Sequence, residues 1–245
     1  MSAALTVADS KRAFHSAFPY VIAPLYRRMV DELLVELHLL SRQAGFRSDP
    51  LFAAGLVQVF DGFSKGYRPD AHRELLLSAI CSASGFDSQS MRQQRDAAIA
   101  AMGSHSVEEV QQWIEQAGAG APDPVAAALA GIRRPDFHYS RLMAVGLLSL
   151  LEQAQGADAM DPSALRSYAH DLGSALGLLK DRLDKDLSLY AANLEKMVQA
   201  VELMEETVAA ERRKRERQQQ PSPGDGAPSE PAGEPAAAEA APSAG

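Results

Sequence analysis

The sequence predicts an all-α protein: a multi-helix bundle of about eight helices, followed by a long coiled-coil-like helix and a disordered tail. Three observations predict this class. Apolar residues recur at helical spacing along most of the chain, helix-capping residues separate the segments, and the turn dipeptides of β-hairpins are nearly absent. The Asp-Gly pair at Asp61-Gly62 lies inside a helical pattern rather than between two alternating segments.

Start and stop signals divide the first part of the chain into five predicted helices. Aspartate precedes several of them as an N-cap, and proline occupies first positions where its missing N–H is harmless. Glycine follows the last turn, where a left-handed residue is favoured. The helices are predicted from near Val7, over residues 22–44 with Pro24 and Gly45 at the ends, from Asp49-Pro50 to Gly66, over 70–84 before Gly85, and from Asp87 to Gly103.

The same signals continue through the second part of the bundle. Ser106 and Glu109 form a capping box, in which each residue satisfies a free backbone N–H of the first helical turn. This box opens a predicted helix over residues 107–117. The remaining predicted helices are a short one from Asp123-Pro124, a strongly apolar one over 138–153, and one from Asp161-Pro162 to about Lys180.

The most informative pattern lies near the end of the chain. Apolar residues alternate spacings of four and three, which is the heptad seam of a coiled coil. We therefore predict one long helix over about residues 186–217, following a bundle over 1–185. The seam stays soluble only if it packs on the rest of the chain, on a second copy or on another protein. Its members are Leu183, Leu187, Tyr190, Leu194, Met197, Val201, Met204 and Val208.

A basic run over residues 212–217 precedes a tail over 218–245 that is rich in alanine and proline. The run can complement the negative end of the helix dipole, contact anionic lipid, or bind nucleic acid. The net charge of −8 and the acidic tail argue against a nucleic-acid partner. The tail has too little apolar surface to offset chain entropy, so we predict that it is disordered.

Catalytic and metal-binding patterns are scarce. No glutamate is followed three residues later by histidine, as di-iron bundles require, and the phosphate-binding glycine loop is absent. Glu32 and Glu36 lie one helical turn apart, but His38 falls on another side of the same predicted helix. Cys81 lies in an apolar helix and reads as a buried structural thiol. We predict no enzyme, no cofactor and no metal site; a metal-binding or enzymatic bundle and a generic coiled-coil scaffold remain the alternatives.

Several segments, taken together, resemble the thylakoid formation protein family. They follow the family's order from about residue 6 to residue 215. The segments are residues 6–14, 26–40, 46–50, 59–69, 137–141 and 186–197.

This resemblance implies an all-α fold without catalytic activity and a role in the biogenesis and repair of photosystem II and of thylakoid membranes. It implies the membrane-bound FtsH protease complex as the partner that the protein binds and maintains, with photosystem II assembly components as further partners. Chloroplast members carry a transit peptide and this sequence shows none. We therefore expect a cyanobacterial-type protein, attached peripherally to the cytoplasmic side of the thylakoid membrane.

Partner contacts are predicted at clusters that combine aromatic residues with arginine, because these types are enriched at interface hot spots. The alternative is that the same side chains tie helix ends to their neighbours by hydrogen bonds and stacking. Self-association through the 183–208 heptad is a further possibility. The predicted contact residues are Tyr26, Arg27, Arg28, Tyr67, Arg68, Phe137, His138, Tyr139 and Arg141.

Overall fold

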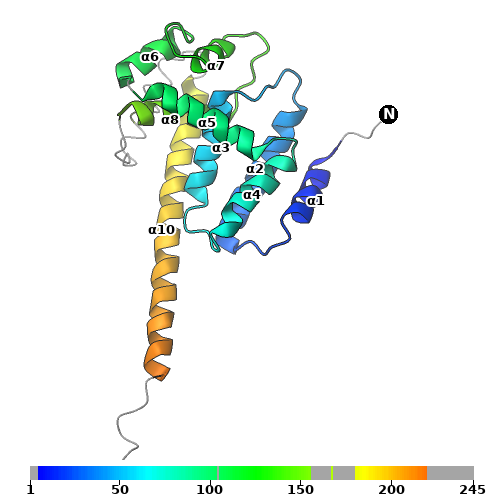
Figure 1. The fold of residues 1–245 in the computed structure, drawn as a ribbon, viewed down its shortest axis with the longest axis vertical. Coiled ribbons are helices and arrows are strands. Elements are labelled where there is room, and N and C mark those ends of the chain that lie inside the picture. Colours follow the sequence, from blue (N-terminus) through cyan, green and yellow to red (C-terminus); the bar gives the residue numbers. More distant parts are fainter. Residues whose placement is uncertain (1–4, 104, 156–166, 168–179, 220–245) are drawn as a thin grey trace, which may run out of the picture. The chain divides into compact units, whose positions relative to one another are not determined.

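The computed structural model describes residues 5–103, 105–155, 167 and 180–219, and every regular element in these ranges is a helix (Figure 1). The predicted all-α class is confirmed. Most of the predicted helix from 161–162 to about 180 lies outside the described residues, and so does the predicted tail over 218–245 apart from its first two residues, which belong to the last helix. The helices are α1 (Val7–Ala17), α2 (Pro24–Arg42), α3 (Pro50–Phe63), α4 (Ala71–Ser82), α5 (Ser88–Met102), α6 (Val107–Glu115), α7 (Val125–Gly131), α8 (Arg141–Gln155) and α10 (Lys180–Gln219).

Predicted caps fix three of the helix starts, those of α3, α5 and α6. At α5 the Asp87 carboxylate accepts a hydrogen bond from the Gln89 backbone nitrogen at 3.0 Å. The Asp49 carboxylate accepts a hydrogen bond from the Phe52 backbone nitrogen at 2.8 Å and opens α3. The capping box of Ser106 and Glu109 forms at the start of α6. Local hydrogen bonds of this kind need no tertiary contact, which is why the sequence alone places them correctly.

Two predicted starts are displaced. Helix α8 begins at Arg141 rather than at His138, because the Ser140 hydroxyl accepts a hydrogen bond from the Met143 backbone nitrogen and caps the helix there. The long helix begins at Lys180, about one and a half turns before the predicted start at residue 186.

Capping at α3 gives a direct test of local stabilisation. We expect Asp49→Ala to lower the free energy of unfolding by about 1 kcal/mol, because the Phe52 N–H loses its acceptor. Asp70→Ala is the matched control, since Asp70 stands at the N-cap of α4 without making a side-chain cap hydrogen bond. Urea unfolding followed by circular dichroism measures both; equal costs would contradict the capping role.

Helix α3 is the centre of the bundle and packs against α8 with almost no space between the backbones. A Cβ atom added to Gly55 would overlap the Leu142 carbonyl group and lie 2.8 Å from the Gly146 nitrogen. One added to Gly146 would overlap the carbonyl oxygen of Leu51. The two glycines therefore allow a helix crossing that any side chain would push apart.

Two core clusters meet at this crossing. One joins α1, α2 and α4 to α3 and contains Phe14, Leu37, Phe60 and Ile80. The other joins α5, α6, α7 and α8 and contains Trp113, whose indole packs beside His105 with the ring centres 4.7 Å apart. Both clusters receive residues from α10.

The chain divides into two compact units, with the boundary between Leu203 and Met204, inside α10. In the first unit, the heptad seam packs on its own chain: Leu183, Leu187, Tyr190, Met197 and Val201 are all buried. In the second unit, residues 205–218 are exposed, and Arg212 forms an i,i+4 ion pair with Glu216 at 2.9 Å. Self-association through the 183–208 heptad stays a prediction.

Candidate functional site

Two of the predicted contact residues, Tyr26 and Tyr67, lie inside the bundle. Their side chains are 1% and 2% exposed, and their rings meet edge to face with centres 4.9 Å apart. The Tyr26 hydroxyl donates to the Lys65 carbonyl oxygen at 3.2 Å. The pair thus joins α2 to the turn that follows α3, which is the structural alternative that the sequence left open.

The arginines beside these tyrosines lie at the surface. Arg27 donates to the Ile22 carbonyl oxygen at 3.0 Å, and Arg28 pairs with Glu32 at 2.8 Å on the same helix. Arg68 pairs with Asp70. All three arginine residues are exposed, so their guanidinium groups remain accessible to a partner.

The segment before α8 holds the end of α2 in place. The His138 Nε2 atom lies 3.0 Å from the Ala44 carbonyl oxygen, which can only accept, so Nε2 carries the proton. The other ring nitrogen, Nδ1, then accepts from the Gln43 side-chain amide. Phe137 packs, partly buried, against the second core cluster.

Tyr139 and Arg141 meet residues of two other helices. Arg141 Nε donates to Glu36 Oε2 at 2.6 Å, and the Tyr139 hydroxyl donates to Asp186 Oδ2 at 2.8 Å. We call these four residues, together with Glu32, the α2–α8–α10 junction. Arg141 Nη1 lies 3.6 Å from Glu32 Oε2. The junction unites residues from three distant parts of the chain, and pattern analysis identified Tyr139 and Arg141 without their partners.

The junction holds three carboxylates, those of Glu32, Glu36 and Asp186, against the single guanidinium of Arg141. Burial raises the pKa of Glu36, and the Arg141 guanidinium beside it opposes that shift. Burial also raises the pKa of Tyr139, and the hydrogen bond that it gives to Asp186 raises it further. The guanidinium of Arg182 covers the Tyr139 ring, 4.6 Å from its centre, as a cation–π contact.

We expect Arg141→Met to lower the free energy of unfolding by about 1–2 kcal/mol, because Glu36, only 15% exposed in its side chain, would keep a charge without its cation. Arg28→Met is the matched control: its side chain is 86% exposed, and we expect a change within about 0.5 kcal/mol. Guanidinium chloride unfolding compares the two variants. Equal losses would show that the Arg141 pair is no stronger than a surface pair.

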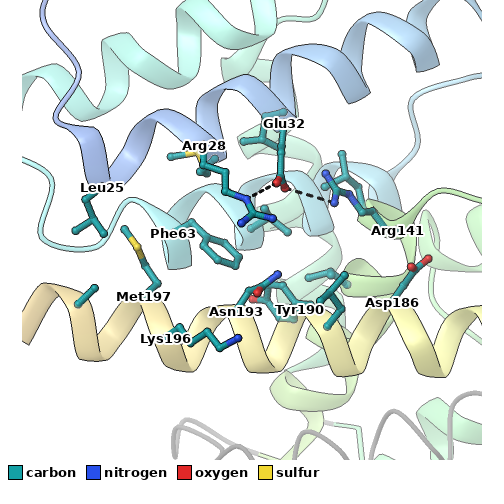
Figure 2. A pocket seen from close by; sticks show the side chains of 17 residues that line it. Leu25, Arg28, Glu32, Phe63, Arg141, Asp186, Tyr190, Asn193, Lys196 and Met197 are labelled. Atoms are coloured by element: carbon teal, nitrogen blue, oxygen red, sulfur yellow. Dashed lines mark hydrogen bonds and ion pairs between the residues drawn. The ribbon is translucent and has the colours of Figure 1, made fainter.

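Two hollows flank the junction. A cavity of about 270 Å³ lies between α2 and α10, with residues of α3 and α8 as its floor (Figure 2). An open groove of about 580 Å³ runs along the other side of α2, between Asp31 and Arg182. Of the predicted contact residues, Arg28 and Arg141 line the cavity, whereas Tyr139 and Arg141 line the groove.

Comparison with known proteins decides the family. A model of the thylakoid formation protein family matches residues 6–219, which include all of the helices described above. The chain belongs to this family. A relative from Prochlorococcus marinus (strain MIT 9313), Protein Thf1, is 55% identical over 217 residues, which cover 88% of this chain and 89% of the relative. Protein Thf1 of Synechococcus sp. (strain CC9902) is 51% identical over 216 residues.

A solved structure agrees with this assignment. The structure of Psb29 superposes with a TM-score of 0.72 at 33% sequence identity, covering 86% of this chain and 99% of that one. The resemblance that the sequence segments predicted is therefore confirmed. The family's description and the relatives' names are those of a thylakoid formation factor and name no enzymatic activity.

In this thylakoid formation protein, the groups that sequence patterns raised as chemical candidates make ordinary structural contacts. His38 shares a buried hydrogen bond with Ser10, with 2.9 Å between Nδ1 and Oγ. Burial raises the pKa of the Cys81 thiol to about 12, so it is protonated at neutral pH. No group of three or more His, Cys, Asp or Glu side chains in the described part of the chain could hold a metal ion.

Residues 62–66 read Gly-Phe-Ser-Lys-Gly, which is the Gly-x-Ser-x-Gly pattern of hydrolase nucleophile elbows. In that motif the serine sits on a sharp strand-to-helix turn beside a histidine base. Here the pattern begins in the last turn of α3, with Ser64 at the C-cap, and the buried Ser64 hydroxyl accepts a hydrogen bond from Arg73 Nε at 2.8 Å. A buried serine held by a cation is not an activated nucleophile.

Proposed function

We propose that this protein is a non-enzymatic auxiliary factor in thylakoid membrane and photosystem II biogenesis and repair, which acts by binding and maintaining the FtsH protease complex. The family match over residues 6–219 carries the proposal, because it includes every described helix and is accompanied by relatives of similar length. Photosystem II assembly components are further proposed partners.

The proposed location is the cytoplasmic side of the thylakoid membrane, by peripheral attachment. None of the helices in the described ranges is both long and apolar enough to cross a bilayer. Under this proposal, attachment therefore comes from the surface of the protein and from its partner. Its sidedness is tested by protease treatment of sealed thylakoid vesicles, in which an outward-facing protein is digested without detergent.

The exposed arginines are the better candidates for partner contact than the tyrosines beside them. Tyr26 and Tyr67 are buried in the core and cannot contact a partner. The neighbouring arginines are exposed and carry their guanidinium groups at the surface; they are Arg27, Arg28 and Arg68. Arginine forms bidentate contacts with carboxylates, which suits an acidic partner surface.

The C-terminal unit is the second proposed contact. Its residues 205–218 are exposed and end in the basic run 212–217. A truncation that tests this segment has to end after Leu203 rather than near residue 186, because Leu187, Tyr190 and Val201 belong to the core.

Capture of FtsH from detergent-solubilised thylakoid membranes tests the proposal, with the full chain and the chain ending at Leu203 compared after thermal melting has shown that both fold. Recovery by the full chain alone would support the C-terminal unit as the contact. Recovery by both would place the contact on the bundle, where Arg27→Glu with Arg68→Glu should abolish it. Failure of both at low and moderate salt would overturn the FtsH part of the proposal.

A further inference from the structure

The cavity between α2 and α10 is apolar inside although it is open to solvent. Met29 and Leu33 of α2 and Tyr190 and Met197 of α10 are almost fully buried, yet they border this space of about 270 Å³. Phe63 of α3 forms part of its floor (Figure 2). Protein interiors are normally filled to crystal-like density, so apolar space left open between two packed helices is room that a small apolar ligand can fill.

The shape of the cavity limits what it can hold. Its lining on α10 extends from Asp186 to Ala200, which is about 21 Å at the helical rise of about 1.5 Å per residue. A volume of about 270 Å³ is enough for one hydrocarbon chain of about a dozen carbons at protein packing density, whereas a helix with its side chains is about 10–12 Å across. A single extended hydrocarbon chain fits this space and a helix does not.

Polar residues of α2 and α10 also line the cavity. Figure 2 shows Arg28 extending from α2 into the space between the helices, with Asn193 and Lys196 on the α10 side. The two carboxylates in the lining are already engaged: Glu32 pairs with Arg28 and Arg141, and Asp186 accepts from Tyr139. Lys196 has no ion-pair partner among the described residues, so its ammonium is free to bind an anion.

We propose that this cavity binds a free fatty acid, with the hydrocarbon chain along the floor formed by Val59, Phe63 and Val145 and the carboxylate beside Lys196 and Arg28. A space with room for one chain favours a free acid over a two-chain membrane lipid. The combination of buried apolar walls with cations in the lining is what a single-chain carboxylate requires. The inference shares only Arg28 with the FtsH proposal and is tested without FtsH.

Isothermal titration calorimetry of the full chain with dodecanoate, below its micelle concentration, tests the proposal. We expect saturable binding at one site, weakened about tenfold by Lys196→Gln, because a charge-assisted hydrogen bond is lost. Ala200→Phe fills one end of the cavity and should abolish binding. Lys185→Gln, an exposed lysine on the same helix outside the cavity, is the matched control and should bind as the parent does.

Three results would overturn the proposal. The first is the absence of saturable binding by a chain with a normal melting transition. The second is binding that neither Lys196→Gln nor Ala200→Phe changes. The third is equal affinity for dodecanol, which lacks the carboxylate. Binding to phosphatidylglycerol vesicles that is lost in Ala200→Phe, without binding of dodecanoate, would assign the cavity to a membrane lipid chain and would also overturn the free-acid assignment.

Discussion

Gly55→Ala is expected to lower the free energy of unfolding by about 3 kcal/mol or more, and Gly146→Ala by a similar amount. At both positions the new methyl group would meet backbone of the opposite helix, which cannot rotate away as a side chain could. Helices α3 and α8 would have to separate, and both core clusters pack around that crossing. Guanidinium chloride unfolding followed by circular dichroism measures the change.

The control for these variants is Gly131→Ala at the end of α7, where nothing lies within 4 Å of the added atom. Alanine there should be neutral or stabilising by up to about 1 kcal/mol, because it restricts the unfolded chain. The double variant of Gly55 and Gly146 should cost less than the sum of the single variants, since one separation of the helices accommodates both. A loss at Gly55 no larger than that at Gly131 would contradict the close backbone contact.

Glu152→Gln is expected to raise the free energy of unfolding by about 1–3 kcal/mol at pH 8 and to leave it nearly unchanged at pH 4. Burial raises the pKa of Glu152 from its ordinary value of 4.5 to about 7, and Gln58 Nε2 donates to its carboxyl group at 3.0 Å. The folded state therefore favours the protonated acid. Its contribution to stability is complete below about pH 4.5 and is lost as the pH rises through about 7.

The pH dependence of unfolding between pH 4 and pH 8 separates this effect from a change in packing. The parent should lose stability with rising pH over that window, and Glu152→Gln should remove that part of the slope. Glu195→Gln, at an exposed position of α10, is the control and should leave the slope in place. A constant difference between parent and Glu152→Gln at every pH would show that the amide only packs better.

Helix existence and local caps are predictable from this sequence because the interactions concerned span three or four residues. Asp49 and the Ser106–Glu109 box are of this kind. The apolar pattern predicts that α8 starts at His138, but the single hydroxyl of Ser140 decides the true start at Arg141. The spacing of the heptad seam predicts that the seam is covered. It does not tell whether the chain's own bundle or a helix of another protein covers it.

The candidate site was harder to predict because its contacts are remote. Arg141 and Glu36 are 105 residues apart in the sequence. No pattern around either residue predicts that the two side chains form an ion pair. Gly55 and Gly146 did carry a signal, since each interrupts an otherwise apolar helical run, and a glycine there indicates close approach of another backbone. Each aromatic–arginine cluster combines a residue of the core with a residue of the surface, and the sequence pattern does not tell them apart. Burial in the structure does: Tyr26 is a core residue and Arg27 is a surface residue.

The place of α10 in the core has a consequence for synthesis on the ribosome. Tyr190 packs on Phe63 with ring centres 5.9 Å apart, and Val201 fits against Gly66. These contacts can form only after the ribosome has translated almost all of the residues that belong to the bundle. Until then, the nascent helices present the apolar side that α10 will cover, so the growing polypeptide passes through a stage at which chaperones or neighbouring chains can bind it.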